Sequence, residues 1–321
     1  MFRRVHVLLF VVLIATGSYP PAAVAQSRPD GAEALYSPSD KASAQNPAYS
    51  PDGKTLLFTI FQDGYNHGGA GLNLMPSSGG APQVLVRQGD QAAVNLPGSA
   101  WNGPTGSIAF SFDVTDQDEI WTLRPGDAPR QVTNHSGATK YTEPGFAPGG
   151  DWIVFQENVD QNTPGARGTI WKVRTDGSDP TKLVDGPATN TDNRQPNWSP
   201  RGDMIVFQSR TGNSGPWRLI TIAPDGSGRR VITGGDGEDT DPSFGPDGNW
   251  VVYSSEHGGL ANAQIFVTRS DGAGQPVRVT TFDGYDGAPS WSPDGAWIAF
   301  ESGPKDRAPT ALWRIPAPKV N

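Results

Sequence analysis

The stretch APSWSPDGAWIAFESG, Ala288 to Gly303, decides the fold because the chain contains six versions of it. Each version has an aromatic residue, a turn with proline and glycine, and a short apolar run that ends in a second aromatic residue. The turn prolines recur every 44 to 53 residues. A period of roughly 40–50 residues is typical of propellers and repeat arrays. These prolines are Pro51, Pro104, Pro148, Pro200, Pro246 and Pro293.

Two aromatic positions frame the turn in all six copies. Proline presets φ at the second turn position and glycine accepts a left-handed φ, so the turn favours a tight hairpin. Large rings at fixed positions are expected to fill the gaps between neighbouring units. The position before the turn holds Tyr49, Trp101, Phe146, Trp198, Phe244 and Trp291, and the position after it holds Phe58, Phe110, Phe155, Phe207, Tyr253 and Phe300.

Each unit also predicts two further strands. The apolar run after the turn is about four residues long, which favours a buried strand over a helix. A third strand follows, as at Ile170-Trp171, and then a short polar fourth strand, as at Thr181 to Val184. Four antiparallel strands make one propeller blade. The sequence therefore predicts an all-β fold, a six-bladed β-propeller of four-stranded antiparallel blades.

The ends of the repeat array predict how the ring closes. The last copy ends at Pro316 to Asn321 without a fourth strand, and residues Ala32 to Ser37 precede the first copy without a unit of their own. We expect residues 32–37 to supply the outer strand of the sixth blade, so that an N-terminal strand closes the propeller.

The copies that begin with APSWSPDGAWIAFESG resemble the PD40, or WD40-like, repeat of the TolB-type propellers, over about residues 32–315. This resemblance implies the same fold and work in the bacterial envelope through protein partners. TolB-type proteins carry a sizeable domain before the propeller, whereas only about twenty residues separate the expected cleavage site from the first repeat here. Similar repeats also occur in oligogalacturonate lyases, where residues at the channel mouth and a metal do the chemistry.

The first residues predict export. Arg3 and Arg4 precede an apolar run, and Ala23-Val24-Ala25 has the small-x-small pattern of a cleavage site. We therefore expect a signal peptide at 1–25, a flexible lead at 26–31, the propeller at 32–321, and a periplasmic or secreted protein with no membrane insertion after cleavage. The chain has no cysteine, so stability must come from packed blades rather than disulfides.

The charge narrows the classes of partner. The net charge is −8, and removal of Arg3 and Arg4 with the leader takes it to about −10. An acidic chain without a basic cluster is a poor ligand for nucleic acid. We expect a protein or peptide partner, envelope-associated by the family resemblance, and a monomer.

Long loops are predicted on one face of the ring only. Strands one and two, and strands three and four, are joined by tight turns, whereas the other connections are longer and are expected to lie together on the opposite face. Long loops on a rigid scaffold commonly carry binding sites. We call this the long-loop face; its connections are 62–71, 87–96, 113–118, 134–142, 157–168, 185–194, 210–216, 234–240, 256–262, 282–287 and 303–310.

Three sets of side chains in these loops are candidates for a site. His67, His135 and His257 would form a metal site only if they converge, and otherwise are solvated loop residues. The acidic residues Asp236, Glu238, Asp239, Asp241, Asp283 and Asp286 either bind calcium or cap their own turns. Tyr65, Tyr141, Tyr285 and Arg194 are residue types that anchor binding patches, although Arg194 also has aspartates near it with which to pair.

No catalytic motif is visible. The chain lacks a cysteine nucleophile, a Gly-x-Ser-x-Gly elbow, a Walker-type loop and a His-Glu-x-x-His motif. We expect a non-enzymatic binding propeller without a cofactor, whose site comprises Tyr65, His67, His135, Tyr141, Arg194, Asp239, Asp241, His257, Asp283, Tyr285 and Asp286. The alternative is a polysaccharide lyase, a glycoside hydrolase with paired carboxylates from different blades, or a lectin.

Overall fold

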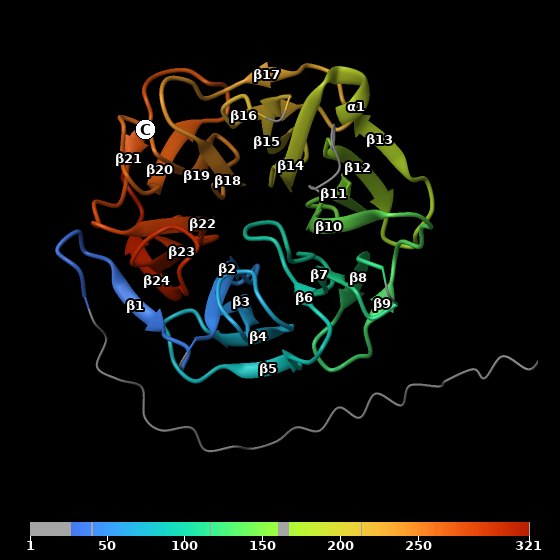
Figure 1. The fold of residues 1–321 in the computed structure, drawn as a ribbon, viewed down its shortest axis with the longest axis horizontal. Coiled ribbons are helices and arrows are strands. Elements are labelled where there is room, and N and C mark those ends of the chain that lie inside the picture. The colour runs from blue at the N-terminus through green and yellow to red at the C-terminus, as the bar shows by residue number, and fades with distance from the viewer. Residues whose placement is uncertain (1–26, 40, 116, 160–166, 213, 321) are drawn as a thin grey trace, which may run out of the picture.

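A computed structural model describes residues 27–39, 41–115, 117–159, 167–212 and 214–320. The predicted signal peptide, 1–25, lies outside these residues. Within them, six four-stranded antiparallel sheets surround one axis (Figure 1), and each sheet is one blade. The predicted six-bladed propeller is therefore confirmed.

The first strand of each repeat lies nearest the axis and the second lies next to it. The inner strands are β2 (Ser43–Tyr49), β6 (Ala93–Val94), β10 (Thr139–Phe146), β14 (Thr191–Trp198), β18 (Asp239–Phe244) and β22 (Tyr285–Trp291). The second strands are β3 (Thr55–Phe61), β7 (Ile108–Phe112), β11 (Trp152–Val159), β15 (Ile205–Thr211), β19 (Trp250–Ser255) and β23 (Trp297–Gly303).

The third and fourth strands complete each blade toward the rim. The third strands are β4 (Ala70–Pro76), β8 (Glu119–Leu123), β12 (Thr169–Arg174), β16 (Arg218–Ile222), β20 (Gln264–Arg269) and β24 (Ala311–Pro316). The outer strands are β5 (Gln83–Val86), β9 (Arg130–Gln131), β13 (Thr181–Val184), β17 (Arg230–Val231), β21 (Val277–Arg278) and β1 (Glu33–Tyr36). One short helix, α1 (Gly186–Thr189), is seen in the described residues, between blades three and four.

The N-terminal strand closes the ring as the sequence predicts. Strand β1 pairs antiparallel with β24, with Ala34 opposite Trp313, so the first described strand completes the last blade. Figure 1 shows the blue strand β1 beside the red strand β24. Leu35 of β1 packs into the hydrophobic cluster between blades six and one. The two ends of the propeller are thus held together by one sheet.

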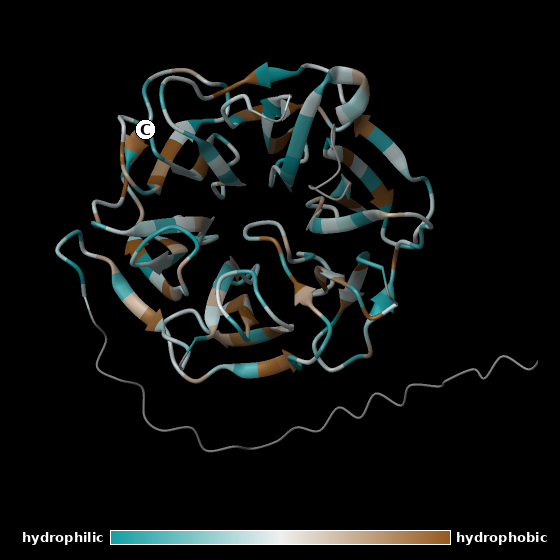
Figure 2. Cartoon of the chain, in the orientation of Figure 1, coloured by the Kyte–Doolittle hydropathy of each residue, from teal (hydrophilic) through white to brown (hydrophobic). Residues whose placement is uncertain are grey.

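The second aromatic position fills the seams between blades. Its rings in all six copies are at most 1 % exposed. Phe207, for example, packs against Val154 and Ile170 of the preceding blade, and Phe300 packs against Val252 and Ile265. The first aromatic position is less buried, because Trp101, Phe244 and Trp291 are half-exposed. Figure 2 shows hydrophobic residues concentrated on the strands, whereas the connecting loops are mostly polar or neutral.

The tight turns form as the Ser-Pro-Asp-Gly pattern predicts. Gly53 and Gly295 have φ of 71° and 74°, and their N–H groups donate to the carbonyls of Ser50 and Ser292 at 2.9 Å. Turn aspartates are tied into these turns and into those before the outer strands. Serine hydroxyls of the same turn donate to them and lower their pKa values: Asp52, Asp176, Asp225 and Asp294.

Candidate functional site: a carboxyl ring in the central channel

The inner strands share a bend that determines which side chains line the channel. In five of them the register shifts at an X-Pro pair, and residue X has φ near +50°. Residues other than glycine rarely adopt this conformation, and such an extra residue in one strand is a β-bulge. Glycine occupies the matching place in blade two, with φ of 85° at Gly98. The other five bulge residues are Asn46, Glu143, Gln195, Asp241 and Ala288.

At four of the bulges, the backbone N–H of the bulge residue donates a hydrogen bond to a side chain of the preceding blade. The acceptor is the side chain that directly follows the buried aromatic residue of the second strand. A buried N–H without an acceptor would cost free energy. The hydrogen bond therefore stabilises the arrangement in which the two neighbouring blades bring this donor and acceptor together. Four such bonds are seen: Gln195 to Gln156 at 2.8 Å, Asp241 to Gln208 at 2.9 Å, Ala288 to Ser254 at 3.2 Å and Asn46 to Glu301 at 3.2 Å.

Glu301 is the one carboxyl among these four acceptors, and it lies at the seam where the last blade meets the first. Its other oxygen accepts a hydrogen bond from the Tyr285 hydroxyl at 3.2 Å, and that hydroxyl lies 3.2 Å from the hydroxyl of Tyr65. Burial raises the pKa of Glu301 to about 8, and the charge of Asp241 adds to this effect. Glu301 therefore keeps its proton at neutral pH.

Two further carboxyls lie at bulges around the same channel. Glu143 and Asp241 are half-buried, although protein surrounds them, as expected of side chains that line a narrow channel. Burial raises the pKa of Glu143 to about 7, against the opposing charge of Arg194. Burial also raises the pKa of Asp241. The channel thus gathers three carboxyls, from blades three, five and six, whose pKa values are raised by burial.

Blade two crosses the channel. Its inner strand β6 has two residues, and the chain after it turns toward the axis (Figure 1). The Ser99 N–H and hydroxyl both donate to Oδ1 of Asn197 in blade four at 2.8 Å, and the Ser99 carbonyl accepts from Phe146 of blade three at 2.7 Å. Blade two therefore contacts blade four across the axis, as well as its neighbour blade three, and obstructs the channel there.

We expect Gly98→Ala to be costly because of this crossing. A Cβ at Gly98 would lie 2.5 Å from Oδ1 of Asn197 and 2.6 Å from Cβ of Ser243. Together with the left-handed φ, this should lower the unfolding free energy by about 3 kcal/mol in urea titrations. The control is Gly106→Ala, where φ is +69° and no atom lies within 4 Å of the new Cβ. Gly106→Ala should lower the unfolding free energy by about 1 kcal/mol. Equal losses in the two variants would contradict the close contact of blade two with blade four.

The structure brings Tyr65, Tyr285 and Asp241 of the predicted site together around Glu301. His135 and Tyr141 form a second group, with rings stacked at 4.1 Å. Nε2 of His135 lies 2.7 Å from the Thr139 carbonyl, and Nδ1 lies 2.9 Å from Glu119 but out of line for a hydrogen bond. These contacts fix the loop between blades two and three.

The remaining charged candidates are mostly paired. Arg194 pairs with Asp192 at 2.9 Å and lies over the Trp217 ring at 5.3 Å. Buried Asp239 accepts a hydrogen bond from Ser255 at 2.7 Å and lies 3.5 Å from Arg218. Asp286 is fully buried and pairs with Arg28 at 2.8 Å. Asp283 is exposed.

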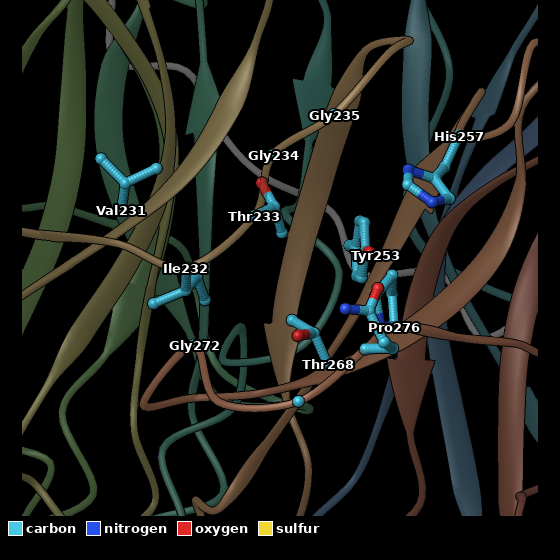
Figure 3. A pocket seen from close by; sticks show the side chains of 12 residues that line it. Val231, Ile232, Thr233, Gly234, Gly235, Tyr253, His257, Thr268, Gly272 and Pro276 are labelled. Carbon is cyan, nitrogen blue, oxygen red and sulfur yellow. The ribbon is translucent and has the colours of Figure 1, made fainter.

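The three histidines belong to separate parts of the ring. His67 is exposed, and His257 lines a hollow of about 340 Å³ beside Thr233 and Tyr253 (Figure 3). Nδ1 of His257 is 3.9 Å from Asp236. Across the residues that the structure describes, no three His, Asp or Glu side chains are grouped as a metal site would require.

Sequence reasoning missed Glu143 and Glu301. A signal for Glu301 was present, because the residue after the second aromatic is Thr59, Ser111, Gln156, Gln208 or Ser254 in the other copies, all uncharged. Glu143 shares its position before a proline with Asp241. That these carboxyls face one channel depends on the bulges, which no single repeat reveals.

Solved structures with the same fold are numerous. A chain assigned to TolB from Agrobacterium tumefaciens is 20% identical, with a TM-score of 0.57, and the match covers 86% of this chain and 90% of that one. An oligogalacturonate lyase in complex with manganese is 14% identical, with a TM-score of 0.60 and coverage of 94% and 97%. A gluconolactonase from Xanthomonas campestris is 16% identical, with a TM-score of 0.62 and coverage of 90% and 89%. At these identities the likeness shows the fold alone.

Comparison with curated protein sequences finds no match. In the described part of the chain, no helix has the length and apolar character needed to cross a membrane. The family profile of the TolB beta propeller domain, PD40, matches residues 87–258, which is more than half of the chain. The chain therefore belongs to the TolB beta propeller domain (PD40) family.

Proposed function

We propose that this protein is an exported, non-enzymatic propeller that binds a protein or peptide partner through its long-loop face. The observation that carries the proposal is the gathering of tyrosine, tryptophan and arginine side chains from several blades on that face. Turn aspartates on the tight-turn face accept hydrogen bonds within their own turns, as Asp52 does from Ser50 at 2.7 Å and Asp294 does from Ser292. Their hydrogen-bonding capacity is already used locally.

The long-loop face instead offers aromatic and charged groups from several blades. Half-buried Tyr65 meets the buried ring of Tyr285 edge to face, with ring centroids 6.1 Å apart, and the Tyr285 hydroxyl donates a hydrogen bond to Glu301. In blade four, Arg194 and Arg210 both lie over the Trp217 ring, at 5.3 and 4.5 Å from its centroid, and both pair with Asp192. Tyrosine, tryptophan and arginine are the usual anchors of protein interfaces. These groups support a peptide-sized contact surface around the mouth of the channel.

The alternative, a polysaccharide-active enzyme or lectin, requires histidines and basic residues that converge at the mouth. His135 is held by contacts within its own loop region, and His257 lies in the hollow between blades four and five. Neither arrangement favours the alternative. The carboxyls Glu143, Asp241 and Glu301 do come from different blades, so an assay for sugar binding belongs in any test.

The proposal is tested by thermal unfolding of the purified protein with EDTA, with manganese and with acidic oligosaccharides, alongside co-purification from cell envelopes. We expect a co-purified protein that binds the purified propeller saturably and is lost in a Tyr65→Ala variant whose far-UV circular dichroism matches that of the wild type. We expect shifts below about 1 °C with the sugars and with EDTA. A saturable shift with an oligosaccharide, without a protein partner, would replace this proposal with the alternative.

A further inference from the structure

The residues just before β1 place an arginine inside blade six. The sequence predicts a flexible lead at 26–31, but residues 27–31 make specific contacts in the structure. Arg28 is only 9 % exposed. Its guanidinium donates two hydrogen bonds to the two carboxylate oxygens of Asp286, at 2.8 and 2.9 Å, and a third to the Ser302 hydroxyl at 3.0 Å. Asp286 itself is fully buried.

Three aromatic rings form the walls around this guanidinium. The Arg28 guanidinium carbon lies 4.4 Å from the ring centroid of Phe282, 5.3 Å from that of Phe300 and 5.1 Å from that of Trp313. Cations within about 6 Å of a ring face are attracted by its quadrupole, most strongly when water is excluded. A planar guanidinium also matches a carboxylate through two parallel hydrogen bonds, which an ammonium does not.

The segment that carries Arg28 is a short turn with few other anchors. The Arg28 N–H donates to the Ala32 carbonyl at 2.8 Å, and the Gly31 N–H donates to the Arg28 carbonyl at 2.9 Å. Asp30 accepts from Arg28 at 3.1 Å and from the Thr281 N–H at 3.2 Å. The turn thus delivers a guanidinium and a second carboxylate to a surface made by a distant part of the chain.

The part of blade six that contacts Arg28 needs a cation. Without Arg28, the Asp286 carboxylate would be buried without its paired charge, which is strongly unfavourable in a protein interior. Phe282, which is 36 % exposed, forms the outer wall, so the cage borders solvent on that side. The buried carboxylate, the two parallel hydrogen bonds and the surrounding rings therefore all favour a guanidinium group as the ligand.

We propose that Asp286, Ser302, Phe282, Phe300 and Trp313 form a guanidinium-binding site for which Arg28 is the tethered ligand. When Arg28 is absent, the site binds an arginine side chain of another peptide. In the native chain the tether holds Arg28 at a high effective concentration, so an external arginine competes poorly. The site also links the residues before β1 to the blade that β1 completes.

The test uses the full chain with Arg28→Ala and, as probe, the acetylated peptide of residues 27–33. We expect the substitution to lower the melting temperature by about 5–10 °C, because it leaves a buried carboxylate unpaired. The peptide should restore this loss saturably and bind in isothermal titration calorimetry. The same peptide with lysine in place of arginine, and the peptide added to the wild-type protein, should each bind at least about tenfold more weakly.

Two further variants keep the result decisive. If Arg28→Ala does not fold, the same titrations on Arg28→Gln apply, since this variant keeps part of the apolar stem without a tethered cation that would compete with the peptide. Adding Asp286→Asn to Arg28→Ala should abolish peptide binding. Absence of binding by the arginine peptide to a folded Arg28 variant, or equal binding of the lysine peptide, would overturn the proposal.

Discussion

Deletion of residues 26–40 is expected to lower the melting temperature by about 10–20 °C, or to prevent folding. The deletion removes β1 and the Arg28 turn, and with them the antiparallel pairing to β24. It also removes the buried side chains of Ala32 and Leu35 and the contact between Tyr36 and Phe58, whose ring centroids are 5.6 Å apart. Loss of this apolar burial and of a buried ion pair amounts to about 5–10 kcal/mol.

The ring-closing role can be separated from general damage by two point variants in outer strands. Leu35 in β1 is 8 % exposed, whereas Val84 in β5 is 52 % exposed. Leu35→Ala should lower the unfolding free energy by about 2–3 kcal/mol, and Val84→Ala by less than about 0.5 kcal/mol. An unchanged melting temperature in the deletion variant, measured by calorimetry, would remove β1 as the closing strand.

Glu301→Gln is expected to stabilise the protein at pH 8 by about 3–5 kcal/mol and to flatten the pH dependence of its stability. The pKa of Glu301 is raised from 4.5 in the unfolded chain to about 8 in the folded protein. The folded state therefore binds a proton more tightly, so this group's stabilisation is complete below pH 4.5. It is lost as the pH rises to 8 and does not change further above that pH.

Glutamine suits this site because two other seams of the ring already use it. Gln156 and Gln208 accept the equivalent bulge N–H in blades four and five. The matched control is Gln208→Glu, which places a carboxyl at the equivalent acceptor position of another seam, where the native side chain is uncharged. This substitution should lower the free energy of unfolding only slightly at pH 4 and by several-fold more at pH 8, as measured in urea titrations. If wild type and Glu301→Gln lose stability in parallel between pH 4.5 and 8, Glu301 is not protonated in the native state.

The fold could be predicted from the sequence because each repeat encodes its own blade. The Ser-Pro-Asp-Gly turn and the two aromatic positions recur with one period, and a missing last strand matched an unassigned first strand. The seams at Phe58, Phe207 and Phe300 formed as expected because a large ring after the turn has a neighbouring blade against which to pack. Local chemistry and global architecture agree at these residues.

The channel could not be predicted in the same way. Glu301 and Asn46 are 255 residues apart, and their contact exists only once the ring is closed and the strand bulges. Ser99 reaches Asn197 because blade two has a two-residue inner strand, which its repeat sequence does not reveal. Arg28 was assigned to a flexible lead because its partner Asp286 is 258 residues away. Contacts between blades depend on register and closure, which a pattern within one repeat does not contain.

The proposed binding face can be tested directly by photo-crosslinking in cells. A photoreactive residue would be placed at His67 or Asp283 on the long-loop face, and at Asp225 or Asp294 on the tight-turn face, all of which are exposed. We predict a discrete crosslinked protein from positions 67 and 283 only, and saturable binding of that purified protein to the wild-type propeller. Equal crosslinking from both faces, or none from positions 67 and 283 together with saturable binding of an oligosaccharide, would contradict it.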